Sequence, residues 1–307
     1  MGGSSSERDV SIKTGKAVIT SLSKQYEVEP VEILFDGSDF PFLDKVQKGD
    51  VVFNALHGGS GENGDIQSLL DMRGISYTGS GPSASRICMD KHISKLIAQN
   101  EGVKVPDWFV HKNTMSYDRI LLNDSLLKAE KIFYPCIVKP NNEGSTMGLA
   151  KVDSEDQLDL AIDRVMKFST EVMIEEHVSG REITVGVLGF SEGSKALPII
   201  EIFPKKDIFD YECKYSEGMS TYEVPAKIDQ DLASRIHKDA IKIHESIGCR
   251  HYSRVDFILG DNNDYYFLEI NSLPGMTSTS LLPMAAKSAG MNFDELIETI
   301  LNMAIHQ

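Results

Sequence analysis

The chain has few cysteines, and their spacing excludes the most common cysteine-based architectures. Cys88, Cys136, Cys213 and Cys249 are far apart in the 307-residue sequence and form no C-x-x-C pair. This spacing predicts neither a disulfide framework nor a cysteine-based zinc site. It favours reduced thiols in a cytoplasmic protein.

Long apolar runs and an excess of positive charge are also absent. No apolar stretch approaches the length that spans a bilayer, and no basic segment followed by an apolar one opens the chain. Thirty-one Lys and Arg residues stand against 46 Asp and Glu residues, which gives a net charge of −15. Such a charge repels nucleic acid and anionic membranes. We therefore expect a cytoplasmic protein that binds neither nucleic acid nor membranes. We also expect a few Lys or Arg side chains to lie together wherever an anionic substrate binds.

The remaining composition is globular, with 41% hydrophobic and 25% charged residues, and the length suffices for two or three domains. The first hundred residues have the pattern of an open α/β sheet. Strands are predicted at 28–34, 50–56 and 75–78, and helices at 10–22 and 66–73.

The rest of the chain has a mixed α+β pattern. Helices are predicted at 89–100 and 230–247, and strands at 108–110, 134–139, 172–176, 182–188, 252–259 and 265–271. We divide the chain into an N-terminal domain (1–84), a central domain (85–170) and a C-terminal domain (171–307).

The last two strands are joined by a turn at 260–264 and predict a β-hairpin. Alternation places Arg254 and Asp256 on one face, and Glu269 and Asn271 opposite Leu268 and Ile270. The oxygens of Asp256, Glu269 and Asn271 suit Mg²⁺, and Arg254 suits a reacting anion. An ordinary solvated hairpin face explains the spacing equally well. The small and hydroxylated residues that follow at 272–280 favour the metal site.

Two glycine-containing segments are further candidates for anion binding. A predicted strand carries Lys139 to the loop 140–148, which is rich in small residues but is not a Walker A loop. The segment Gly59-Ser-Gly61-Glu-Asn-Gly64 matches G-x-G-x-x-G. The strand after it lacks the terminal acid that would hold a ribose, which disfavours a nicotinamide site.

The motifs together, in their order, resemble the D-alanine–D-alanine ligase family over nearly the whole chain. The resemblance rests on Glu7-Arg-Asp-Val-Ser11, Ala55-Leu-His-Gly58, Gly61-Glu-Asn-Gly64, Met89-Asp-Lys91, Val138-Lys-Pro140, Glu143-Gly-Ser145, Tyr211-Glu-Cys-Lys-Tyr215, Arg254-Val-Asp256, Glu269-Ile-Asn271 and Pro274-Gly-Met-Thr-Ser278. It implies an ATP-grasp fold of three domains. It also implies ATP-dependent joining of two D-alanines through a D-alanyl phosphate, for peptidoglycan synthesis. Family members carry a strand before the glycine pair Gly2-Gly3, so the N-terminal parallel sheet is expected to lack its first strand.

The resemblance implies a role for each matching residue. ATP phosphates would meet Lys91, Lys139 and Lys214, adenine would meet Glu175, Glu176 and Val178, ribose would meet Glu182, and Mg²⁺ or Mn²⁺ would meet Asp256, Glu269 and Asn271. The first D-alanine would pair with Glu7, which Ser145 and Tyr215 would support. Arg254 and Gly275 would bind the oxyanion, and Ser280 with Leu281 the carboxylate of the second D-alanine. His57 would lie near the substrates, although a buried structural histidine fits its position equally well.

The resemblance also implies a homodimer. Three alternatives stay open: a ligase that takes D-lactate or D-serine as second substrate, a catalytically silent ATP-binding protein, and a nicotinamide oxidoreductase. The pair Lys214-Tyr215 favours D-alanine among the ligases.

Overall fold

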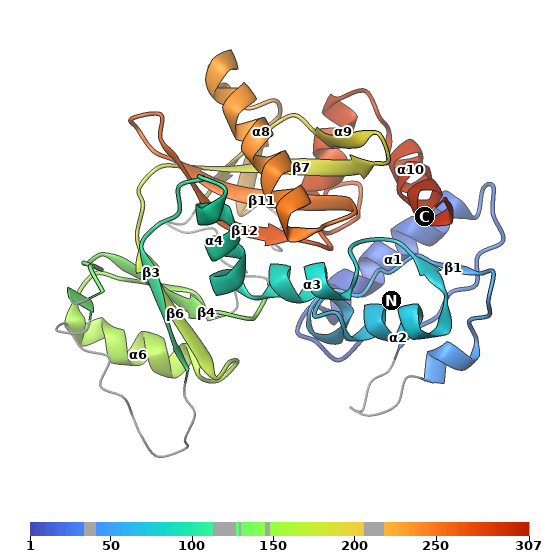
Figure 1. The fold of residues 1–307 in the computed structure, drawn as a ribbon, viewed down its shortest axis with the longest axis horizontal. Coiled ribbons are helices and arrows are strands. Elements are labelled where there is room, and N and C mark those ends of the chain that lie inside the picture. Colours follow the sequence, from blue (N-terminus) through green and yellow to red (C-terminus); the bar gives the residue numbers. More distant parts are fainter. Residues whose placement is uncertain (34–40, 113–126, 129, 145–147, 206–217, 307) are drawn as a thin grey trace.

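The computed structural model describes residues 1–33, 41–112, 127–128, 130–144, 148–205 and 218–306. Three groups of elements follow one another along the chain (Figure 1). The N-terminal group holds α1 (Arg8–Leu22), η1 (Pro41–Asp44), β1 (Val51–Val52), η2 (Gly59–Gly61), α2 (Asp65–Arg73) and β2 (Ser76–Tyr77). Among the described residues, no helix combines the length and the apolar character needed to cross a membrane.

The N-terminal sheet is smaller than the sequence predicts. β1 and β2 pair in parallel over two residues each, and Gly2 forms an isolated parallel bridge with Ile33. The strand predicted at 50–56 is cut short because the Asn54 side chain accepts the N–H of Leu56 at 3.1 Å, which turns the chain. The strand predicted at 28–34 is wrong over 28–32, where Pro30 has no N–H to give to a ladder.

The central sheet has the order β3-β6-β4-β5 and is antiparallel throughout. Its elements are β3 (Trp108–Lys112), β4 (Cys136–Pro140), β5 (Ala150–Val152), α6 (Glu155–Val165) and β6 (Glu171–Glu176). Because β6 belongs to this sheet, the chain leaves the central group after Glu176 and not at the predicted boundary after residue 170.

Two helices lead into the central sheet where the sequence predicts one at 89–100. α3 (Pro82–Met89) and α4 (Lys91–Asn100) are separated by Asp90, whose backbone is extended. The Asp90 carboxylate accepts the N–H of Ile93 at 3.1 Å and so caps α4. The break makes Lys91 the first residue of a new helix, which is what aims it at the site described below.

The C-terminal sheet has the order β10-β9-β7-β11-β12, with β8 paired to β7. Its elements are β7 (Arg181–Phe190), β8 (Gly193–Ala196), β9 (Ile200–Pro204), β10 (Ser220–Glu223), α8 (Gln230–Ile247), β11 (His251–Leu259), β12 (Tyr265–Asn271), α9 (Leu281–Ser288) and α10 (Phe293–Ile305). The predicted helix 230–247 and the predicted hairpin are confirmed.

The hairpin contains a bulge that the sequence pattern does not reveal. Asp256 pairs with Glu269, but its neighbour Phe257 pairs with Phe267, so β12 carries one extra residue at Leu268. Phe267 is consequently buried with Ile270, and Leu268 turns to the same side as Glu269. The prediction that Leu268 opposes Glu269 is therefore wrong.

The first helix packs against a helix from the far end of the chain. α1 lies beside α10 (Figure 1), and Val18 and Leu22 share a core with Leu296 and Ile300. The Ser21 hydroxyl donates to Asp294 at 2.7 Å, across 273 residues of sequence. The N-terminal group is thus closed by residues of the C-terminal group.

Two buried histidines predict a loss of stability in mild acid. Burial lowers the pKa of both His244 and His251 to about 4 from an ordinary 6.5. The unfolded chain therefore binds more protons than the folded chain between these values. The free energy of unfolding should fall as pH drops from 6.5 to 4, by about 1.4 kcal/mol per pH unit for each histidine.

Urea unfolding near pH 7 and near pH 5 checks this, with His251→Asn as the comparison. His251 has φ of 66° and accepts the N–H of Gly79 at 3.0 Å. Asparagine tolerates that backbone and keeps an acceptor, but it does not titrate. The variant should lose less stability than the parent between the two pH values, and equal losses would contradict the assignment.

Candidate active site

A cavity of about 380 Å³ lies between the central sheet and the C-terminal sheet. All the predicted nucleotide contacts among the described residues line it, namely Lys91, Lys139, Glu175, Glu176, Val178 and Glu182. β4 and β6 supply one wall, and β7, β11 and β12 supply the other. Apolar side chains, among them Ile137, Leu149, Ile183 and Leu268, also line it. Charged groups and apolar side chains in one cavity suit an anionic ligand with an aromatic part.

Two residues of the predicted metal face, Asp256 and Glu269, line the same cavity, and Asn271 contacts Asp256 beside it. Asp256 accepts two hydrogen bonds from Arg254, at 2.9 and 2.8 Å, and one from the Asn271 amide at 3.1 Å. The Glu269 carboxylate lies 3.5 Å from the Lys91 ammonium. Within the described ranges, no group of three or more His, Cys, Asp and Glu residues is arranged as a metal site. The set here is two carboxylates and an amide, which is oxygen chemistry suited to a hard cation.

A second polar cluster is built around Glu7, at the start of α1. Its carboxylate is buried between two glycines, because a Cβ placed on Gly58 or on Gly144 would lie 2.8 or 2.9 Å from it. His57 is buried nearby, with Nε2 2.9 Å from the Thr14 hydroxyl and Nδ1 3.5 Å from Glu62. Burial raises the pKa of Glu62. Both nitrogens of His57 thus have partners, and its ring lies in the cluster that holds Glu7.

The loop before α9 adjoins this cluster. Thr14 connects the two, since its hydroxyl contacts His57 and accepts the N–H of Met276 at 3.4 Å. Within the loop, the Ser280 hydroxyl accepts the N–H of Thr277 at 3.1 Å. A Cβ on Gly275 would lie 3.1 Å from that hydroxyl, so the turn is tight. Gly275 and Ser280 are therefore neighbours, next to the end of β12 that carries Asn271.

Known proteins resemble this chain in sequence over nearly its whole length. Residues 97–302 match the family model described as "D-ala D-ala ligase C-terminus", and residues 35–80 match "D-ala D-ala ligase N-terminus". The chain belongs to the D-alanine–D-alanine ligase family. A D-alanine–D-alanine ligase of Halalkalibacterium halodurans is 39% identical over 99% of this chain and 97% of its own, and one of Aquifex aeolicus is 41% identical over 98% of each.

Solved structures of the family agree with the fold. The D-alanine–D-alanine ligase of Bacillus anthracis, complexed with ATP, has a TM-score of 0.82 and 34% identity, with 100% of this chain and 95% of that chain covered. The VanG D-Ala:D-Ser ligase of Enterococcus faecalis has a TM-score of 0.81 and 26% identity, covering 99% and 97%. The predicted family, ATP-grasp fold and ATP-dependent ligase class are confirmed, and the nicotinamide alternative is wrong.

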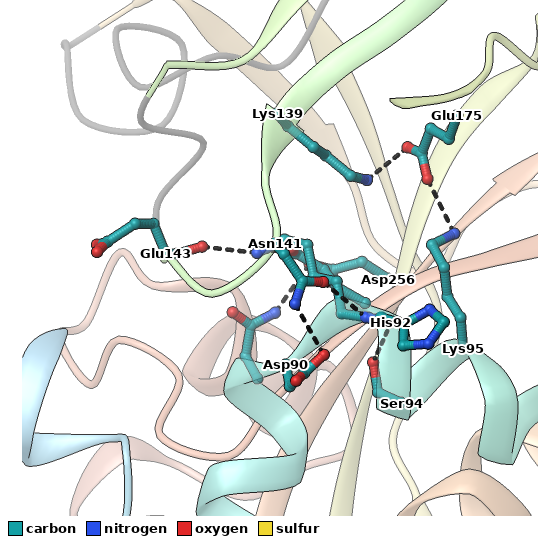
Figure 2. A network of polar contacts seen from close by, with 12 residues as sticks. Asp90, His92, Ser94, Lys95, Lys139, Asn141, Glu143, Glu175 and Asp256 are labelled. Carbon is teal, nitrogen blue, oxygen red and sulfur yellow. Dashed lines mark hydrogen bonds and ion pairs between the residues drawn. The ribbon is translucent and has the colours of Figure 1, made fainter. Parts of the chain in front are cut away.

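Sequence reasoning missed a buried cation that contacts a cavity residue, Glu175. Lys95 is fully buried on α4, and its ammonium lies 3.0 Å from one oxygen of Glu175, whose other oxygen contacts Lys139 (Figure 2). Burial lowers the pKa of Lys95 to about 8. Burial alone would raise the pKa of Glu175, but the positive charges of Lys139 and Lys95 outweigh the effect of burial and lower that pKa below its ordinary value. The signal in the sequence is the i, i+4 spacing from Lys91.

Asn141 is a second residue that the sequence analysis missed. Its amide donates to Asp90 at 2.9 Å and to Glu171 at 2.8 Å, and its own oxygen accepts the N–H of His92 at 2.9 Å (Figure 2). Asn141 thereby fixes the start of α4 against the end of β4, the two points from which Lys91 and Lys139 project.

Three predicted site residues, Ser145, Lys214 and Tyr215, lie outside the described residues. The roles implied for the other site residues stay predictions, although the structure brings most of them to one cavity and its neighbouring cluster.

Proposed function

We propose that the chain joins two D-alanines at the expense of ATP, with ATP in the cavity between the sheets and the amino acids beside Glu7 and Gly275. The observation that carries this proposal is the convergence of Lys91 and Lys139 on a cavity that also holds the carboxylates of Asp256 and Glu269, with the buried Lys95 behind them on Glu175. In a chain with a net charge of −15, a cluster of positively charged side chains in one cavity indicates a site for a polyanion.

Different residues would contact the phosphates, the adenine and the ribose of the nucleotide. Lys91 and Lys139 would neutralise phosphate charge, which is most of what phosphoryl transfer needs from a protein. Glu175, Glu176 and Val178 would border adenine, and Glu182 would accept hydrogen bonds from the ribose. The Lys139 ammonium contacts Glu175. It would exchange this partner for phosphate when the nucleotide binds.

The residues of the hairpin face fit a divalent cation. Asp256 and Glu269 offer carboxylate oxygens, and Asn271 directs its NH₂ group to Asp256, which leaves its carbonyl oxygen as a ligand atom. When bound, Mg²⁺ would supply charge neutralisation between the phosphates of ATP. Arg254 would then be shared between Asp256 and the anionic reacting group.

The amino acids would react beside the second cluster. Glu7 would hold the ammonium of the first D-alanine so that its carboxylate attacks the γ-phosphate and forms a D-alanyl phosphate. The amine of the second D-alanine would then attack that carbonyl carbon, and phosphate would leave. Arg254 and the Gly275 N–H would stabilise the oxyanion between these steps. Ser280 and the Leu281 backbone would hold the second carboxylate. The homodimer and the cytoplasmic location stay predictions.

A coupled assay of ADP release tests the proposal. We expect release to depend on D-alanine and on Mg²⁺, with little release when L-alanine replaces D-alanine, because the proposed contacts to the ammonium and the carboxylate would fit one enantiomer. Mixtures of D-alanine with D-serine or D-lactate, with products separated by mass, identify the second substrate. If neither D-alanine alone nor any of these mixtures stimulates ADP release, the chain is not a ligase of this substrate class.

A further inference from the structure

Two cysteines that the sequence places far apart meet in the folded chain. The Sγ atoms of Cys88 and Cys249 lie 3.5 Å apart across 161 residues of sequence. Cys88 is the next-to-last residue of α3 and is buried, whereas Cys249 follows the C-terminal cap of α8 and is only partly buried. The pair therefore bridges the start of the central group and the C-terminal group.

The backbone on both sides of this pair is anchored. Arg250 donates from its backbone to Ser80 at 3.4 Å and from Nε to the carbonyl of Gly79 at 3.1 Å. Its guanidinium lies 4.8 Å from the centre of the Tyr77 ring. His251 accepts the N–H of Gly79. The segment that carries Cys249 is thus docked on the segment that leads into α3, and the two sulfurs are held close by this interface.

Little movement separates the two thiols from a covalent bond. The sulfurs of a disulfide are about 2.05 Å apart, so each sulfur needs to move by less than 1 Å, roughly, which side-chain rotation can supply. Neither residue lines the nucleotide cavity, and neither is among the residues to which a substrate role is assigned. The reaction of the ligase makes no use of these thiols.

We propose that Cys88 and Cys249 form a dithiol site that low-molecular-weight disulfides oxidise to an intramolecular disulfide bond. The thiolate of the more exposed Cys249 attacks one sulfur of the reagent, breaks its S–S bond and releases one thiolate. The Cys88 thiolate then attacks Sγ of Cys249, forms the protein disulfide and releases the second thiolate. The two released thiolates take the two protons, the cysteines lose two electrons, and the reagent gains them.

The environment of Cys88 sets how the rate depends on pH. The hydrogen bond with Cys249 and burial raise the pKa of the Cys88 thiol. Because the thiolate is the nucleophile, closure of the bond should be faster at higher pH. The bond would also act close to the nucleotide cavity, since Cys88 stands two residues before Asp90, the cap of α4, and three before Lys91.

Peptide mapping of the full chain tests the proposal. The reduced protein is incubated with glutathione disulfide near pH 7 and near pH 8.5, free thiols are blocked, and the protein is digested with trypsin without reductant. Cleavage after Arg86, Lys91, Lys242 and Arg250 leaves Cys88 in peptide 87–91 and Cys249 in peptide 243–250. We expect these two peptides joined, two hydrogens lighter than their sum, in greater yield at the higher pH.

The melting temperature gives a second readout. A bond that closes a loop of this length should raise it by on the order of 5 °C, and reductant should reverse the rise. Cys249→Ser should lose both the joined peptide and the temperature rise. Cys136 is the matched internal control, because burial in β4 raises the pKa of its thiol to about 11 and it should stay unmodified.

One result overturns the proposal directly. If Cys249 carries only glutathione, or if Cys88 stays fully reduced after long incubation at the higher pH, the two thiols do not form a site. This mapping is done on the unmodified sequence, so it stands even if a serine variant fails to fold.

Discussion

Replacement of Lys95 by methionine is expected to raise the KM for ATP at least tenfold while the fold persists. Lys95 is the second cation on a buried carboxylate, with its ammonium 3.0 Å from Glu175. Without it, Glu175 keeps Lys139 as its remaining cation and competes with the phosphates for that ammonium. A tenfold loss is about 1.4 kcal/mol, which is modest beside the cost of breaking a buried ion pair. Methionine preserves most of the buried volume and leaves the pair Glu175 and Lys139 intact.

The pH profile separates this positioning role from a packing role. The pKa of Lys95 is about 8, so the wild-type kcat/KM for ATP should decline as pH rises above that value and the ammonium loses its proton. Lys95→Met should lack this decline, whereas a defect of packing would lower the whole curve and keep its shape.

Lys104→Met is the matched control for the loss of a lysine. The Lys104 ammonium lies 2.7 Å from Asp264 on an exposed part of the hairpin, where an ion pair contributes little. The KM of Lys104→Met for ATP should equal that of the wild type. An unchanged KM in Lys95→Met as well would show that the buried cation does not position Glu175.

Glu269→Gln is expected to lower kcat by two orders of magnitude or more. The carboxylate lies on the cavity side of β12, 3.5 Å from the Lys91 ammonium and opposite Asp256. The amide has the same shape but no charge, so it weakens the binding of a divalent cation and removes one negative charge beside Lys91. The side chain contributes no core volume, and the melting temperature should change little.

A magnesium titration sharpens the test. The concentration of Mg²⁺ that gives half-maximal ADP release should rise in Glu269→Gln, because one ligand has lost its charge. Asp264→Asn, at the turn end of the same hairpin, removes a carboxylate that pairs only with surface groups in the described structure and should behave as the wild type. Wild-type turnover by Glu269→Gln at limiting Mg²⁺ would remove this residue from the metal face.

The hairpin and α8 show how much the sequence alone can predict. Their alternation and helical spacing reflect local contacts, and both elements have nearly the predicted bounds. The bulge at Leu268 was not predictable in this way, because the register of two strands depends on how both pack against the rest of the sheet. The break at Asp90 was different, since an aspartate before a helical run is itself a capping signal.

Candidate site residues were predictable where a sequence motif contains them. They were less predictable where their role depends on burial and on partners that only the fold brings close. The i, i+4 spacing of Lys95 from Lys91 is a signal that many surface lysines share, and the packing of α4 against β12 and the ion pair with Glu175 make Lys95 a buried cation. Asn141 likewise acquires its role from partners on two segments, Asp90 and His92 at the start of α4 and Glu171 at the start of β6. His57 could be assigned to a structural role or to the substrates, and the fold gives it two protein partners, Thr14 and Glu62.

The packing of α1 on α10 has a consequence for how the chain is made. Ribosomes add roughly 5–20 residues per second, and 273 residues separate Ser21 from Asp294. The apolar face of α1, with Val18 and Leu22, therefore stays without its partner for tens of seconds after it leaves the ribosome. During that interval the apolar face of α1 is exposed on the nascent chain. Molecular chaperones that cover such surfaces should therefore increase the yield of folded enzyme. Folding of the N-terminal group is then completed only after translation has delivered α10.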